Sequence, residues 1–199
     1  MRACRASRGL DANATRGLRS RYCVGDTPGV AERLVHPLVD QLRFTRAEFR
    51  RGLRGTPAAD ARRRLEPMNS IGWIVAHMAG HEQRLWLFRA QGVTLRPELL
   101  EIAAYGGPAT TPPLSRMLAA WKAVVEAADP WLDHLTPEDL LDDLGGPKPA
   151  PKVANGLQRI TYHYWYHTGE ILSIRQMLGH RRLPEFVGDI DDEAPYRPA

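Results

Sequence analysis

Four segments of this chain repeat apolar residues at intervals of three and four positions, and this periodicity limits the fold more than any other feature of the sequence. The segments are 29–53, 70–91, 114–130 and 155–178. A helix presents such a stripe on one side, so each segment is predicted to be an amphipathic helix. No internal repeat and no convincing pair of strands accompanies them. We therefore expect an all-α domain, a four-helix bundle with long connections between its helices.

Capping residues stand near the ends of two of these segments. Asn69 or Ser70 is suited to cap the second helix, and Gly92 is suited to end it. Asn155 is suited to cap the fourth helix, and Gly179 to close it. The fourth helix is the clearest of the four in the sequence.

Prolines define the remaining segments less sharply. Pro37 interrupts the first stripe and marks either a kink or a later start of that helix. The third helix is expected to end near Pro130. In residues 134–152, the sequence from Thr136 fits a single helical turn, and the following glycines and prolines predict a loop or short hairpin.

Composition excludes several classes of protein. The chain has 199 residues, of which 43% are hydrophobic and 25% charged, as in an ordinary globular domain. No apolar run is long enough to cross a bilayer, so an integral membrane protein is excluded. Cysteine occurs only at Cys4 and Cys23, which excludes a disulfide framework and a cysteine-rich zinc cluster. We expect a cytoplasmic protein.

The net positive charge of the chain comes from its first residues. Residues 1–21 hold six arginines and one acid, Asp11, which leaves a charge of −1 for the rest of a chain whose net charge is +4. Residues 1–25 are expected to be a disordered or peripheral extension, with a transit peptide as the alternative. Because aromatic residues are not interleaved with the arginines, no nucleic-acid partner is expected. The bundle domain is predicted over 26–185 and an acidic tail over 186–199.

Two histidines on the fourth predicted helix point to metal chemistry. His163 and His167 are one helical turn apart and both fall within the apolar stripe, with Glu170 on the same side. Imidazoles at this spacing can bind a single ion. A lone histidine in such a stripe is usually an ordinary core residue, but a pair with a neighbouring carboxylate favours a divalent metal site.

The second predicted helix supplies the other candidates. His77 lies on its core-facing side, His81 is one turn further along, and Glu82 follows directly. A third histidine from a neighbouring helix would complete a three-histidine site with an open position, the arrangement that catalytic zinc and related divalent metals prefer.

Two stretches resemble the signature helices of the DinB/YfiT-like superfamily. They read SIGWIVAHMAGHE over residues 70–82 and HYWYHTGE from His163, with RQMLGH following. The likeness runs from about residue 30 to 183. The resemblance implies a metal-binding four-helix bundle, often dimeric, in which one histidine of the second helix joins a His-x-x-x-His pair of the fourth. The matching ligands here are His77, His163 and His167.

The resemblance also implies an activity. Characterised branches of the superfamily are thiol transferases and isomerases that use low-molecular-weight thiols such as mycothiol or bacillithiol. We therefore expect a metal-dependent thiol S-transferase, with zinc or nickel as the ion and a small-molecule thiol and an electrophile as partners. A metal-dependent hydrolase and a non-catalytic metal-binding stress-response protein are the alternatives.

Several roles are left open by the sequence. Glu82 and Glu170 are candidates for a base or for a hydrogen-bond partner of a ligand, and Glu170 could also bind the metal directly. His81 is either an alternative ligand or a surface group.

A homodimer is expected because large aromatic residues lie on helix sides other than those that carry the histidines. On the fourth helix these are Tyr162 and Trp165, and on the second they are Trp73 and Trp86. Large aromatics on a second helix face commonly mark an interface, and the family resemblance points the same way.

Overall fold

The structure, a computed structural model, describes residues 35–185 and 187–197. In this part the chain is helical, apart from loops and one isolated antiparallel bridge between Asp143 and Lys152. The predicted all-α fold class is confirmed. The expected extension over residues 1–25 lies outside the described residues. Within the described residues, no helix combines the length and the apolar character needed to cross a bilayer.

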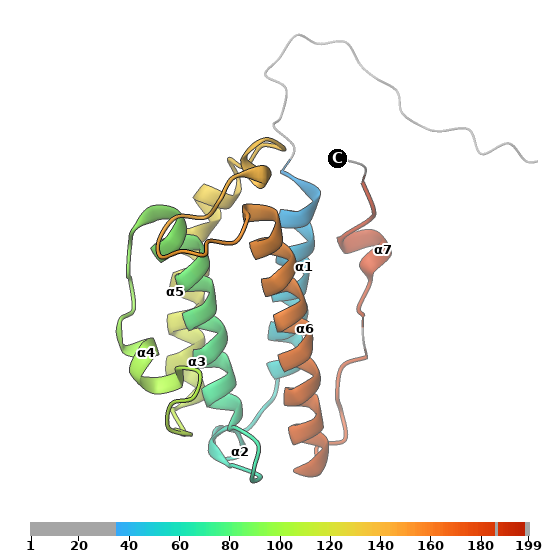
Figure 1. The fold of residues 1–199 in the computed structure, drawn as a ribbon. Coiled ribbons are helices and arrows are strands. Elements are labelled where there is room, and N and C mark those ends of the chain that lie inside the picture. Colours follow the sequence, from blue (N-terminus) through green and yellow to red (C-terminus); the bar gives the residue numbers. More distant parts are fainter. Residues whose placement is uncertain (1–34, 186, 198–199) are drawn as a thin grey trace, which may run out of the picture. The chain divides into compact units, whose positions relative to one another are not determined.

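Four long helical segments correspond to the four predicted ones, and short helices lie in the connections between them and after the last. Helices α1 and α6 pack on each other, α3 packs on α5, and α3 also contacts α6 (Figure 1). The elements, in chain order, are α1 (Pro37–Leu53), α2 (Ala58–Arg62), α3 (Ile71–Glu82), the π-helix η1 (Gln83–Arg89), α4 (Glu98–Ala103), α5 (Leu114–Leu132), the 3₁₀-helix η2 (Asp139–Leu141), α6 (Val153–Met177) and α7 (Ile190–Glu193).

Three of the predicted helix ends are confirmed. The Ser70 side chain accepts a hydrogen bond from the Trp73 amide and caps α3. Gly92 and Gly179 follow the second and fourth long segments with φ of 72° and 83°, the left-handed conformation that glycine adopts without a steric penalty.

The first predicted helix starts later than its stripe. It begins at Pro37, whose fixed φ suits the first turn, and the ring of His36 caps it by accepting from the Leu38 amide. Residues 29–34 lie outside the described part of the chain. The third helix passes Pro130 and ends at Leu132, because a proline within the last turn removes only one hydrogen bond of the ladder.

The fourth helix starts earlier than predicted, so the expectation that Asn155 caps it was wrong. Val153 is its first residue, and the Val153 amide donates to the carbonyl of Asp142 at 2.9 Å. This loop carbonyl satisfies a backbone donor that a side-chain cap would otherwise serve.

The C-terminal segment runs back along α1. Arg51 of α1 donates to the carbonyl of Glu185, and Arg197 forms an ion pair with Asp40 near the start of α1. The acidic residues of α7 are exposed between these two contacts.

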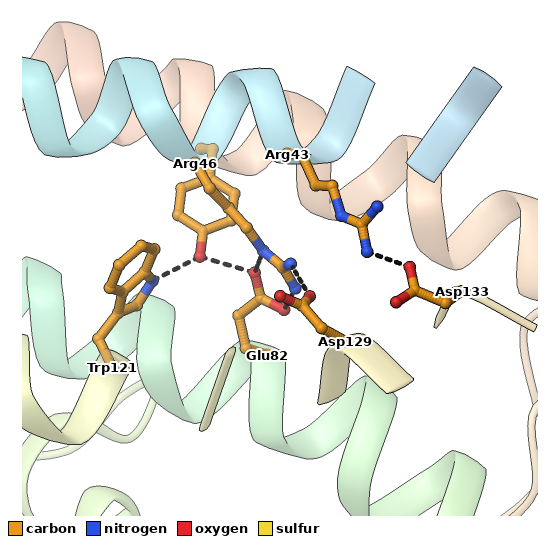
Figure 2. Close-up of polar contacts among 7 residues, drawn as sticks. Arg43, Arg46, Glu82, Trp121, Asp129 and Asp133 are labelled. Atoms are coloured by element: carbon orange, nitrogen blue, oxygen red, sulfur yellow. Dashed lines mark hydrogen bonds and ion pairs between the residues drawn. The ribbon is translucent and has the colours of Figure 1, made fainter. Parts of the chain in front are cut away.

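A buried polar network joins all four long helices (Figure 2). Arg46 of α1 donates two hydrogen bonds to the Glu82 carboxylate of α3, at 2.7 and 2.6 Å, and a third to Asp129 of α5 at 2.7 Å. Glu82 also accepts from the Tyr164 hydroxyl of α6 at 2.7 Å, and Trp121 of α5 donates to the same hydroxyl at 2.6 Å. Burial, followed by the nearby Glu82 carboxylate, raises the pKa of Tyr164, so its hydroxyl stays protonated and donates.

Replacing Glu82 with glutamine should destabilise the fold by about 3 kcal/mol, because the substitution leaves the buried Arg46 without its main counter-charge. Glu82 is 0% exposed and Arg46 is 4% exposed. Urea unfolding measures the change in the free energy of unfolding. The control is Glu126→Gln, which removes an exposed partner of Lys122 and should cost less than about 1 kcal/mol. Equal effects of the two substitutions would contradict this account of the core.

Candidate metal centre

The structure brings the three predicted ligands together. One ring nitrogen from each of His77, His163 and His167 lies within 4.8 Å of the other two. His77 comes from α3 and the other two from α6, whose His163 and His167 Nε2 atoms are 2.9 Å apart. His167 is buried and the other two are half-buried. Donor atoms converging in this way fit one ion.

Two of these rings are oriented by a hydrogen bond at Nδ1, the nitrogen that faces away from the cluster. His77 Nδ1 lies 3.1 Å from the carbonyl oxygen of Ala103, in α4, and His167 Nδ1 lies 2.7 Å from Glu170 Oε2. A carbonyl or carboxylate oxygen only accepts here, so each Nδ1 carries the proton and each Nε2 keeps a free electron pair. This is the arrangement that orients metal-binding histidines in proteins.

His163 also has a partner at its Nδ1 atom, the ring of His81. The two Nδ1 atoms are 2.5 Å apart, on the side of the His163 ring away from His167. When His163 Nδ1–H donates to His81, the Nε2 of His163 is left free toward the cluster. His81 therefore stands behind one member of the cluster and not inside it.

Burial favours the neutral form of His77 and His163 in the cluster and of His81 behind them. Burial, reinforced by the neighbouring imidazoles, lowers the pKa of His163 to about 3. Burial also lowers the pKa of His81 to about 4, and it lowers that of His77. At neutral pH these rings carry a free electron pair and no extra proton, which metal binding requires.

Aromatic rings hold two of the histidines in place. Trp73 stacks on His77 with ring centroids 4.8 Å apart and planes 9° from parallel. Tyr166 meets His167 edge-on at 5.0 Å. Sequence reasoning did not identify these contacts, although Trp73 precedes His77 by four positions, a spacing that places two side chains on one helix side.

Glu82 lies apart from the cluster. Both of its carboxylate oxygens accept hydrogen bonds from Arg46, and one also accepts from Tyr164. In this structure the Glu82 side chain is therefore committed to hydrogen bonds in the core, and the role of base or ligand partner stays a prediction. Of the two predicted carboxylates, Glu170 is the one at the cluster.

A pocket of about 280 Å³ opens beside the histidines. His77, His81 and His163 form part of its lining, Leu99 and Leu100 of α4 add an apolar wall, and two arginines complete it. The cluster is therefore accessible to a small molecule from this side.

The family model described as the DinB superfamily matches residues 41–171, a span that contains all three clustered histidines. No curated protein matches the chain.

The metal-free protein should lose stability as the pH falls from neutral to about 5. An unfolded histidine titrates near 6.5, whereas His163 stays neutral in the folded state until about pH 3. Between these values the unfolded state binds more protons, so stability rises with pH and falls on acidification. Urea unfolding at both pH values measures the effect. His163→Asn should lose less stability than the wild type over this interval, and an equal loss would contradict the assignment.

Proposed function

The chain belongs to the DinB superfamily, and on that premise we propose that it is a metal-dependent enzyme that transfers a low-molecular-weight thiol to an electrophilic substrate. The observation that carries the proposal is the convergence of three imidazoles beside an accessible pocket. The reducing cytoplasm, where thiols persist, is the compartment that suits this chemistry.

The donor set suits zinc or nickel. His77, His163 and His167 would hold the ion through ring nitrogens, which are ligands that both metals accept. Three neutral ligands leave the double positive charge uncompensated and leave room for further ligands. A divalent ion held by these residues would lower the pKa of a bound thiol or water.

The surrounding residues favour a thiol over water as the nucleophile. Hydrolysis at such a site commonly uses a nearby carboxylate as the base. Among the described residues, no carboxylate lines the pocket, and Glu170 is hydrogen-bonded to His167. The apolar wall of Leu99 and Leu100 suits the organic part of a thiol or an electrophile.

Alanine at both His163 and His167 should abolish stoichiometric metal binding, because the site loses two of its three protein ligands. Metal analysis of the untagged protein after dialysis against zinc or nickel measures this loss. His134→Ala is the matched control, since His134 is exposed and outside the cluster. A double variant that binds one metal per chain with unchanged affinity would show that the site is placed wrongly.

The thiol itself is tested on cobalt-substituted protein. Mycothiol or bacillithiol should change the cobalt absorption saturably in the wild type, and thiol consumption should then follow when an electrophile is added. A hydrolytic activity without any thiol effect would replace the proposal with a metal-dependent hydrolase. Metal binding with neither response would leave a metal-binding protein without turnover.

We also propose that the protein forms a homodimer. Trp73 and Trp86 are buried within the chain, so they do not bear on an interface. Tyr162 and Tyr166 do: they are 67% and 69% exposed and lie one turn apart on α6. Exposed aromatic side chains of this kind are typical of interfaces.

Light scattering coupled to gel filtration tests the dimer. The wild type should have the mass of two chains at micromolar concentration. Tyr162→Arg should shift the mass toward one chain while metal content is retained, because a charge in an apolar interface is costly. A wild-type mass of one chain would refute the dimer.

A further inference from the structure

A second hollow adjoins the pocket at the histidines. Its volume is about 420 Å³, and it reaches the loop at Pro149–Pro151 before α6. The two hollows share His81, Arg84 and Arg159 in their linings. Together they form one groove, which we call the arginine groove, leading from the histidine cluster along α3, η1 and α6.

The helix geometry explains why arginines line this groove. Contacts of His77 with His167 and of His81 with His163 show that α3 and α6 run in opposite directions. Arg84 follows His81 by about one turn and Arg159 precedes His163 by one turn, so the next layer beyond the histidines is a pair of arginines. The same pair reaches the histidines electrostatically: after burial and His77, their charges help to lower the pKa of His81.

The π-helix η1 adds a third arginine. In a π-helix the ladder joins residues five apart, so positions separated by five lie near the same side. Arg89 follows Arg84 by five positions, and both line the second hollow. One nitrogen of Arg89 donates to the carbonyls of Gly145 and Pro147, which fixes its guanidinium beside the groove.

The charge of the groove is uncompensated. Most arginines outside the groove that form hydrogen bonds or ion pairs do so with carboxylates, as Arg43 does with Asp133. Among the described residues, Arg84 and Arg159 form no ion pair or hydrogen bond, and no carboxylate lines either hollow. A groove lined by cations with one apolar wall attracts an organic anion.

We propose that the arginine groove binds the carboxylate or phosphate group of the substrate whose other end reacts at the histidine cluster. The inference rests on the proposed function and deepens it, since it makes the substrate, or the thiol that it reacts with, an anion. Arg84 and Arg159 are the residues that select it. A guanidinium presents paired N–H donors that match two oxygens of a carboxylate or phosphate.

The test is an anion titration followed by NMR. Inorganic phosphate and succinate are each added to metal-free and zinc-loaded protein at low ionic strength, and the arginine Nε–H and backbone signals of the groove are monitored. The variants are Arg84→Gln, Arg159→Gln and the pair. Arg116→Gln is the matched control, because Arg116 is also an exposed helical arginine but lies on α5, away from both hollows.

The expected result is saturable binding to metal-free wild type that the double variant weakens by about tenfold or more, with Arg116→Gln close to the wild type. Tighter binding of succinate identifies a carboxylate substrate, and tighter binding of phosphate identifies a phosphorylated one. Wild-type affinity in the double variant, an equal loss in Arg116→Gln, or binding seen only with zinc would overturn the proposal. Because the metal-free arm does not depend on the ion, failure of the metal site alone leaves this result unchanged.

Discussion

The buried ion pair between Arg46 and Glu82 is the constraint on which the rest of the structure depends. Two charges in a dry core are stable only when every polar atom finds a partner, so α5 supplies Asp129 and α6 supplies Tyr164. The network fixes how the four long helices face one another (Figure 2). Its members are also neighbours of the metal centre in sequence. Glu82 follows His81 and Tyr164 follows His163, so the same turns of α3 and α6 hold the core on one side and the histidines on the other.

The candidate metal centre is organised by contacts that fix the Nδ1 atom of each ring. A backbone carbonyl orients His77, a carboxylate orients His167, and a second imidazole faces His163. Each contact is made through Nδ1, so Nε2 faces the cluster, and burial favours the neutral form of His77 and His163. The proposed reactivity follows from the type of donor, since imidazole is an uncharged ligand and three of them would preserve the full charge of a bound ion. The arginine groove continues from the histidine cluster along α3, η1 and α6. It supplies positive charge beside the imidazoles.

Local patterns predicted much of this arrangement. The apolar stripes located the four long helices, Ser70 and Gly179 marked two of their ends, and the spacing of His163 and His167 indicated the ligand pair. Contacts between segments far apart in the chain could not be predicted from these local patterns. The sequence near Ala103 does not indicate that its carbonyl orients His77. No residue pattern predicts the π-helical turn that places Arg89. Glu82 became a candidate because it adjoins His81. Five positions after His77, it falls on the far side of an α-helix, a sign that could have excluded it.

The central claim is that the three imidazoles bind one divalent ion, and X-ray absorption spectroscopy of zinc-loaded protein tests it most directly. The structure predicts nitrogen ligands at about 2.0–2.1 Å with the multiple-scattering signature of three imidazoles. The two cysteines of the chain, Cys4 and Cys23, should contribute no sulfur to the spectrum. Sulfur at about 2.3 Å, or a ligand set with fewer than three imidazoles, would contradict the account.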